Sequence, residues 1–188
     1  FVRLVLTDDP ETRALYPFAF RFEVVFQLGD GRLENALIVT NTGDRPLPYA
    51  CGLHPGFRWP FAGSTAAHAI RFEKAERPAV PVVPLKDGVL ALEPALFAND
   101  ALCFLNIESK HLDFDNGAGA RLHVALDDFP HVGFWTRPPA PYLCIEPWTG
   151  HGDPVDFTGD LFEKPSMRRL EPRAVARHAA TFSLEGEV

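Results

Sequence analysis

The chain has 188 residues, enough for one domain or for two small ones. Apolar residues make up 46% and aromatic residues 12%, which excludes a disordered chain and supports a real core. The formal net charge of -7 disfavours nucleic acid and anionic membranes as partners, and the sequence has no apolar run long enough to span a bilayer. Sixteen Phe against one Met predict a rigid aromatic core.

The three cysteines, Cys51, Cys103 and Cys144, lie inside apolar runs without metal-like spacing. An odd and sparse count indicates free buried thiols in a reducing compartment, so we expect a cytoplasmic protein and leave one disulfide open. No signal peptide is visible. The chain begins without Met and already in a strand-like pattern, so we expect it to lack an N-terminal part.

Alternation of apolar and polar residues, interrupted by turn signals, predicts short strands throughout the chain. The clearest alternation runs over residues 20–28, and Gly29-Asp30-Gly31 predicts a hairpin to the next strand. In chain order, the expected strands are residues 1–7, 20–28, 33–41, 47–53, 69–74, 101–107, 111–114, 120–126, 134–136, 142–146 and 176–184.

Other segments are predicted to connect these strands. Residues 8–11 and 42–46 have turn composition, and residues 77–84, with three prolines, indicate a loop. Residues 92–100 are the best helix candidate, and the alanines of residues 176–184 leave a helix open there. About ten short strands without internal repeats predict an antiparallel all-β sandwich.

The stretch from Tyr142 to Asp153 organises the functional interpretation. Side chains alternate in a strand, so Tyr142, Cys144 and Glu146 share one face while Leu143 and Ile145 share the other. Burial of the two aliphatic residues in a core therefore pushes Glu146 to the opposite face.

Two residues follow that carboxylate at the predicted strand end. Pro147 has no N–H, so regular pairing should stop there or lie at an edge. The indole of Trp148 beside Glu146 suits a sugar, with an apolar platform and an acceptor for hydroxyl protons. The alternative is that Glu146 is a solvated strand-end charge.

His54 is the leading candidate for proton transfer. It follows a short apolar strand, Pro55 keeps it extended, and Gly52 and Gly56 allow the backbone to turn tightly. A histidine on such a loop is suited to acid–base work near neutral pH. The alternative is a structural histidine bonded to backbone.

Other candidates carry less signal. His131 and His151 flank aromatic segments and suit the same cleft, but with His54 and Glu146 they show none of the close spacing of common zinc motifs, so we expect no metal site. Trp side chains either stack on sugar or fill the core. No role is assigned to His68, His111, His123 and His178, and the indoles concerned are those of Trp59, Trp135 and Trp148.

Several segments resemble a known family. Cys51-Gly52-Leu53-His54-Pro55-Gly56-Phe57 resembles the Gly-x-His-Pro-x-Phe segment of the aldose 1-epimerases, the galactose mutarotase-like proteins. Tyr142-Leu143-Cys144-Ile145-Glu146-Pro147-Trp148 is similar to the Cys-Ile-Glu-Pro-Trp segment of the LacX-like branch. Tyr16-Pro17-Phe18-Ala19-Phe20, and Lys164 with Leu170, agree in order.

This resemblance implies a large antiparallel β-supersandwich, the galactose mutarotase-like fold, with the sugar site on a concave sheet face. Residues 1–188 then form a single β-sandwich domain that matches the C-terminal two-thirds of a larger family domain and lacks its N-terminal strands. An arginine and a second histidine that contact sugar in the family belong to that N-terminal part.

The resemblance also implies a reaction. Aldose 1-epimerases interconvert the α and β anomers of an aldohexose through ring opening, with Glu146 as base and His54, carrying a proton, as acid. Neither cofactor nor metal is required. Asp100 is expected to hold a sugar hydroxyl, and Trp135 and Trp148 to form the apolar wall. We expect the His54 ring and the Glu146 carboxylate to lie about one sugar ring's width apart in one cleft.

Three alternatives stay open beside this interpretation. A non-catalytic carbohydrate-binding domain would use the same cleft. A glycoside hydrolase or lyase accessory domain needs a second carboxylate, from Asp153 or Asp156. A hexose-6-phosphate mutarotase needs a basic cluster at the site mouth. The partner is a small sugar in each case, and a homodimer is left open. The basic residues considered are Arg58, Arg137, Arg168 and Arg169.

Overall fold

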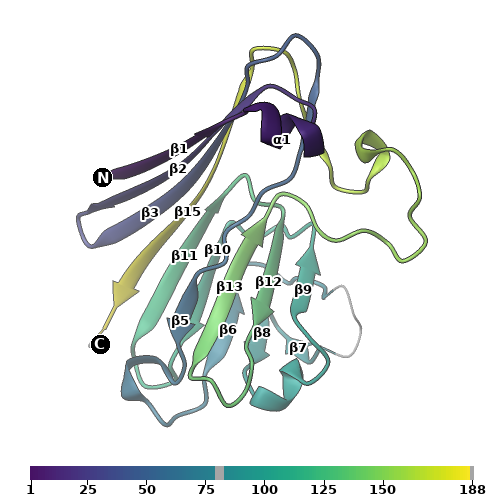
Figure 1. Ribbon diagram of the computed structural model, residues 1–188. Helices are drawn as coiled ribbons and strands as arrows, with labels where there is room; N and C mark the ends of the chain where they lie inside the picture. The colour runs from purple at the N-terminus through teal and green to yellow at the C-terminus, as the bar shows by residue number, and fades with distance from the viewer. Residues whose placement is uncertain (79–82, 187–188) are drawn as a thin grey trace.

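Two antiparallel sheets form the body of the molecule (Figure 1). The computed structural model describes residues 1–78 and 83–186. Within these residues the larger sheet has nine strands. In spatial order they are β1 (Val2–Thr7), β2 (Phe20–Gly29), β3 (Arg32–Asn41), β15 (Val175–Glu185), β11 (Arg121–Asp127), β10 (His111–Asp115), β6 (Ala69–Phe72), β8 (Val89–Ala91) and β7 (Leu85–Lys86).

The smaller sheet lies in front of the β11–β10–β6–β8 part of the larger one in Figure 1. Its four described strands, in spatial order, are β5 (Gly56–Arg58), β13 (Tyr142–Trp148), β12 (His131–Trp135) and β9 (Leu102–Leu105). A separate ladder joins β14 (Arg168–Leu170) to β4 (Leu47–Tyr49). The helical segments are α1 (Pro10–Leu15) and the 3₁₀ turns Phe61–Gly63, Pro94–Phe97 and Leu161–Glu163.

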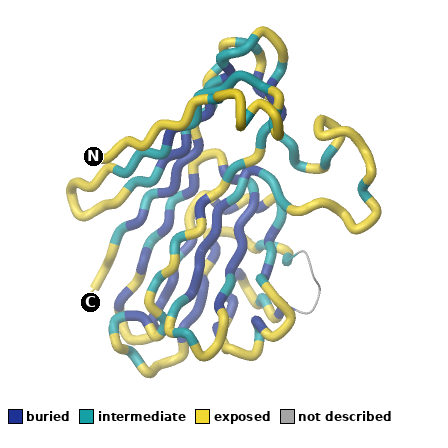
Figure 2. Tube along the Cα trace, in the orientation of Figure 1, coloured by how far each residue is buried: buried dark blue, intermediate teal, exposed yellow. Residues whose placement is uncertain are grey.

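The hydrophobic core lies between the two sheets, where buried stretches of both face each other (Figure 2). The Phe72 ring of β6 packs 4.8 Å from that of Phe104 on β9, and Phe57 of β5 packs 5.3 Å from Phe182 on β15. Each such side chain contributes about 1.5–3 kcal/mol by burial. The predicted aromatic core and the predicted antiparallel β-sandwich are both confirmed.

The expected strands are found with shifted ends. The hairpin at Asp30 and Gly31 is confirmed, because both residues have positive φ (52° and 71°), as a tight primed turn requires. The closing segment is the strand β15, so the helical alternative there is wrong. The helical turn expected in residues 92–100 is present as Pro94–Phe97. Part of the predicted loop 77–84 lies outside the described residues.

One prediction is wrong near the N-terminus. Residues 8–11 were expected to form a turn, but α1 begins at Pro10. Asp9 caps it by accepting from the Thr12 N–H, while the Thr12 hydroxyl accepts from the Asp9 N–H. The Asp-Pro pair that suggests a turn is therefore a helix start. In the described part of the chain, helices are too short and too polar to cross a membrane.

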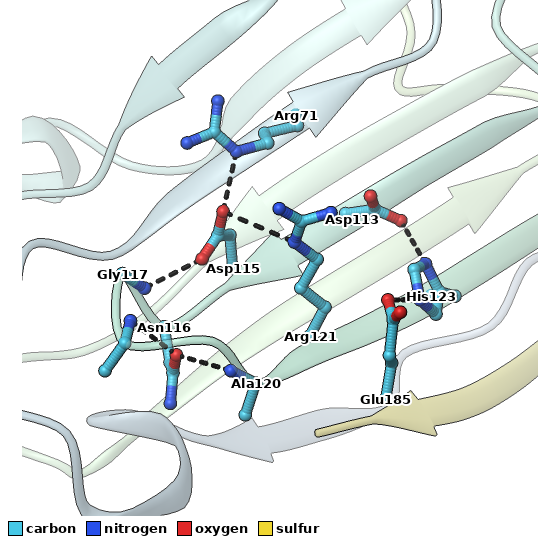
Figure 3. A network of polar contacts seen from close by, with 10 residues as sticks. Arg71, Asp113, Asp115, Asn116, Gly117, Ala120, Arg121, His123 and Glu185 are labelled. Atoms are coloured by element: carbon cyan, nitrogen blue, oxygen red, sulfur yellow. Dashed lines mark hydrogen bonds and ion pairs between the residues drawn. The ribbon is translucent and has the colours of Figure 1, made fainter. Parts of the chain in front are cut away.

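The outer face of the larger sheet carries a cross-strand network of charges (Figure 3). Asp115 accepts hydrogen bonds from Arg71 Nε at 2.7 Å and from the Gly117 N–H at 2.8 Å, and lies 3.6 Å from Arg121 Nε. His123 contacts two further carboxylates, those of Asp113 and Glu185. Asp115 in this network therefore has several donors.

Candidate active site

The strand β13 holds the two faces that its alternation predicts. Leu143 and Ile145 are fully buried in the core between the sheets. Tyr142, Cys144 and Glu146 therefore lie on the outer face of the smaller sheet, as expected. The carboxylate of Glu146 is itself buried, with 7% of its side chain exposed, so the interpretation as a solvated charge is wrong.

Register brings His54 to the same place. In the ladder between β5 and β13, Gly56 faces Cys144. Two residues further along, antiparallel pairing carries His54 to the level of Glu146. The distance between His54 Nε2 and Glu146 Oε1 is 3.3 Å.

The two candidate catalytic groups are thus closer than expected. We expected roughly one sugar ring between them, and they are in direct contact instead. His54 is 60% exposed, on the open side of the sheet, whereas Glu146 is enclosed. The imidazole therefore has room to rotate, and the carboxylate does not.

Pro147 does not end the strand. It pairs with Val132 of β12, and β13 continues to Trp148. The Pro147 carbonyl accepts from the Leu53 N–H on the opposite side, at 2.9 Å. A residue in an antiparallel strand directs its N and its C=O to one side, so the missing N–H faces the side where β5 has already ended. Pairing continues past the proline on that side, where the Thr149 N–H donates to the Cys51 carbonyl and Gly52 bridges to Trp148, so the expectation that pairing stops at Pro147 or leaves it at an edge is wrong.

Burial sets the electrostatics of Glu146. It raises the pKa of this carboxyl above its ordinary value of 4.5, while the charge of His54 and a polar contact with Trp148 lower it and the charge of Asp100 raises it. Among the described residues, none donates a hydrogen bond to Oε1. The site thus contains a buried acceptor without a donor, an arrangement that proteins rarely leave in place without a function.

Two glycines admit the indole of Trp148 beside this carboxylate. Gly133 faces Glu146 across the ladder, and a Cβ there would lie 2.4 Å from Trp148 Cη2. A Cβ on Gly52 would lie 2.6 Å from Trp148 Cδ1. The indole therefore occupies space that any other residue at either position would fill.

A second aromatic group lies on the other side of the carboxylate, along the strands. The Trp135 ring is 6.0 Å from the His54 ring, nearly perpendicular to it at 88°, and 5.8 Å from the Tyr142 ring. Both indoles expected at the site therefore lie on its face. Trp59 instead packs against the core, 6.1 Å from Phe97.

Asp100 lies just before β9, on the side of Cys103. Its negative charge raises the pKa of both Cys103 and Glu146, so Asp100 affects the site electrostatically. Its backbone has a positive φ of 127°, and its own carboxylate accepts from the Ala101 N–H at 2.8 Å. Holding a non-glycine residue in such a conformation costs about 1–3 kcal/mol, and strain of this kind clusters at functional sites.

His131 and His151 form a separate pair beyond Trp148. Their rings are 5.2 Å apart, and His131 is buried, with Nδ1 accepting from the Asn106 N–H at 3.0 Å. Burial, with smaller contributions from His151 and Arg168, lowers the pKa of His131 to about 4. His131 is therefore neutral at pH 7, and its ring lies next to that of His151.

All three cysteines are free, as expected, although Cys51 and Cys103 are half-buried. Burial raises the pKa of Cys51 and of Cys144 to about 11, so both are thiols at neutral pH. Cys103 and Cys144 lie on the outer face beside Glu146. Alternation along the strand predicted that Cys144 shares the face of Glu146, but no motif gave this thiol a role. Cys103 was missed because its strand reaches the site only through β12.

Three of the charged residues considered for the alternative functions form ion pairs elsewhere. Asp153 pairs with Lys164 at 2.8 Å, and Arg168 pairs with Asp128 at 2.9 Å. Arg169 lies 3.5 Å from Glu171.

A comparison with known families decides what the chain is related to. The sequence model of the family described as aldose 1-epimerase matches residues 1–155. This chain belongs to the aldose 1-epimerase family. The motifs around His54 and Glu146 that first suggested the family both fall inside the matched residues.

Individual relatives agree with that assignment. The LacX protein of Lactococcus lactis subsp. lactis is 25% identical over 177 residues, which cover 84% of this chain and 59% of LacX. The chain thus spans about three-fifths of the length of this curated relative. A galactose mutarotase related enzyme from Lactobacillus acidophilus superposes with a TM-score of 0.85 at 28% identity, covering 99% of this chain and 68% of that one. A galactose mutarotase-like protein from Lactobacillus casei gives 0.84 at 22% identity, with 97% and 69% covered.

The superpositions confirm the galactose mutarotase-like fold that the resemblance predicts.

Proposed function

We propose that this protein is an aldose 1-epimerase that interconverts the α and β anomers of an aldohexose, with Glu146 as base and His54 as acid. The observation that carries the proposal is the contact between the two side chains, one buried and one exposed, on a sheet face lined by indoles. Trp135 and Trp148 supply the apolar wall, and Asp100 accepts from a sugar hydroxyl.

The short distance between the two groups suits this reaction. Ring opening removes the proton from the hydroxyl on C1 and adds a proton to the ring oxygen. Both oxygens are bonded to C1, so an acid and a base that lie side by side address both of them. The expectation of a full ring's width overlooked that the two reacting oxygens are on one carbon.

In this mechanism Glu146 and His54 carry out both proton transfers. Glu146 takes the proton from the anomeric hydroxyl, the electrons of that O–H bond form the aldehyde C=O, the bond from C1 to the ring oxygen breaks, and the ring oxygen takes the proton of His54. Rotation about the C1–C2 bond then presents the other face of the aldehyde. On closure His54 is the base and Glu146 is the acid, and both return to their starting states.

Polarimetry on freshly dissolved α-D-glucose and α-D-galactose tests this assignment. We expect Glu146→Gln and His54→Asn each to lose about 10²–10⁴-fold of the catalysed rate, the usual contribution of a positioned proton-transfer group. The uncatalysed rate is subtracted from each trace. An unchanged rate in Glu146→Gln would reject it as the base.

The same experiment separates the alternatives. A non-catalytic binding domain would bind sugar in calorimetry and leave the decay of optical rotation at its uncatalysed rate. A hexose-6-phosphate mutarotase would act on the phosphorylated sugar in preference to the free one.

A further inference from the structure

A third donor atom lies beside the proposed acid and base. A ring nitrogen of His54, the Sγ of Cys144 and a carboxylate oxygen of Glu146 all lie within 4.8 Å of one another. Proton transfer to and from a sugar uses only the histidine and the carboxylate. The thiol is therefore the part of this cluster that the reaction leaves unexplained.

We propose that His54, Cys144 and Glu146 form an inhibitory site for a borderline-soft divalent cation, with Zn²⁺ and Cd²⁺ as the ions that fit. The binding part of this proposal stands on the donor cluster alone. The inhibitory part rests on the proposed function.

The donor types and spacing match such an ion. Imidazole nitrogen, thiolate and carboxylate oxygen are the three ligand types that zinc takes from proteins, at about 2.0–2.3 Å, so neighbouring ligand atoms lie roughly 3.3–3.8 Å apart. The three atoms already lie within 4.8 Å of one another, and His54, with 60% of its side chain exposed, is the ligand with most room to move. Three protein ligands leave a fourth tetrahedral position for water.

Glu146 supplies an independent observation. Its Oε1 is buried and accepts no hydrogen bond from the described residues, although its side chain is directed toward His54. A buried carboxylate oxygen without a donor is costly, and a cation removes that cost. The strand geometry adds a thiol at the right place, because Cys144 and Glu146 are two residues apart on one face of β13.

The expectation that the sequence holds no metal site concerned a different set, in which His131 and His151 took the place of the thiol. Those two histidines lie beyond Trp148, whereas Cys144 lies two residues from Glu146 on the same face of β13. On binding, the Cys144 S–H bond breaks, sulfur keeps the electron pair and binds the ion, and the proton passes to solvent. The ion engages the lone pairs of both catalytic groups, so metal and sugar exclude each other.

Titration of chelator-treated protein with Cd²⁺ tests the binding. We expect one equivalent to produce the ultraviolet charge-transfer band of a thiolate–cadmium bond. Cys144→Ser should abolish this band, whereas Cys103→Ser, which removes a thiol on the same face but outside the cluster, should retain it. His54→Asn, at an exposed position where folding is not at risk, should weaken binding about tenfold or more.

Two results would overturn the site. One is the absence of the band in the wild-type protein at one equivalent. The other is an undiminished band in Cys144→Ser or undiminished affinity in His54→Asn.

Inhibition is measured separately by polarimetry with Zn²⁺. Each protein is compared with its own metal-free rate, and we expect Cys144→Ser to need about tenfold more Zn²⁺ or beyond for half inhibition. Equal sensitivity would contradict the inhibitory role. If the wild-type protein showed no mutarotation at all, the proposed function would fail while the cadmium titration would still decide the metal site.

Discussion

The outer faces of the two sheets carry histidines and carboxylates in opposite arrangements. On the larger sheet, His123 contacts Asp113 at 2.6 Å through Nδ1 and Glu185 at 2.8 Å through Nε2 (Figure 3). On the smaller sheet, His54 meets Glu146 at 3.3 Å, and the contacted oxygen has no hydrogen-bond donor among the described residues.

The pKa directions follow from this difference. Burial raises the pKa of Asp115, but hydrogen bonds from Arg71 and Gly117 and the charges of Arg71 and Arg121 together outweigh it, so the pKa of that carboxyl is lowered. At Glu146 burial dominates, and the pKa is raised. The outer face of the larger sheet pairs its charges, which stabilises the fold, whereas the proposed active-site face keeps a strong acceptor available at a cost in stability.

The largest expected effect is on the pH dependence of mutarotation. Glu146 must be ionised to act as base, and its raised pKa moves the loss of activity to a pH above the ordinary 4.5. Below that pKa we expect kcat/KM to fall about tenfold per pH unit. A pH profile from polarimetry, corrected for the uncatalysed rate, measures it. An acid limb at or below the ordinary value would contradict the burial argument.

Charge removal on the two faces should have opposite effects on stability. Asp115→Asn should lower the free energy of unfolding at pH 7 by about 1.5–3 kcal/mol, because a lowered pKa means that ionisation stabilises the fold. Glu146→Gln should raise it, because a raised pKa means that ionisation opposes folding. Urea denaturation at pH 7 measures both.

The contributions of Asp115 and Glu146 to the free energy of unfolding also change with pH. The Asp115 contribution is present above the unfolded pKa of 3.8 and is lost as the pH falls through its folded value. The Glu146 penalty is full above its folded pKa and is gone below 4.5. If both variants shifted stability in the same direction at pH 7, the contrast between the faces would not hold.

The close packing of the Trp148 indole can be tested at Gly133. A Cβ there would lie 2.4 Å from the ring, so Gly133→Ala should cost about 1–3 kcal/mol by overpacking and should weaken sugar binding by moving the indole. Gly152→Ala is the matched control, because a Cβ at Gly152 meets nothing within 4 Å. Thermal melts and calorimetry with sugar measure the two effects, and an equal response of both variants would contradict the packing.

The smallest expected effect concerns His123. Its bond to Asp113 is the main cause that raises its pKa, with Glu185 adding to it. A raised histidine pKa stabilises the fold below the unfolded value of 6.5 and ceases to do so as the pH rises through the folded value. Because the group is partly exposed, His123→Gln should cost only about 0.5–1 kcal/mol at pH 5 and nothing at pH 9. His111→Gln, on the same sheet, serves as the control for denaturation at both values.

The sequence predicted what local alternation and turn chemistry determine. The sandwich, the hairpin at Asp30 and the outward direction of Glu146 all follow from residues close together in the chain. Burial of Glu146 did not follow, because Gly133 and Gly52, which admit the covering indole, come from distant segments. The helix α1 was missed because Asp9 caps a helix and begins a turn with the same side chain.

The distance between His54 and Glu146 could not be predicted from the sequence. Their common role was expected from family motifs, but their contact depends on the register between β5 and β13, and β5 has only three residues. A strand that short carries no periodic signal. The cluster of His54, Cys144 and Glu146 could not be predicted for the same reason.

Alternation along β13 has a consequence for how this sequence can change. Neighbouring residues such as Ile145 and Glu146 lie on opposite sides of the sheet, one in the apolar interior and one on the proposed active-site face. Inserting or deleting a single residue would move the side chains beyond that point to the opposite face of the sheet and place a carboxylate in the apolar interior. This sequence can therefore change within β13 by replacing side chains at fixed positions, while the length of the segment stays constant.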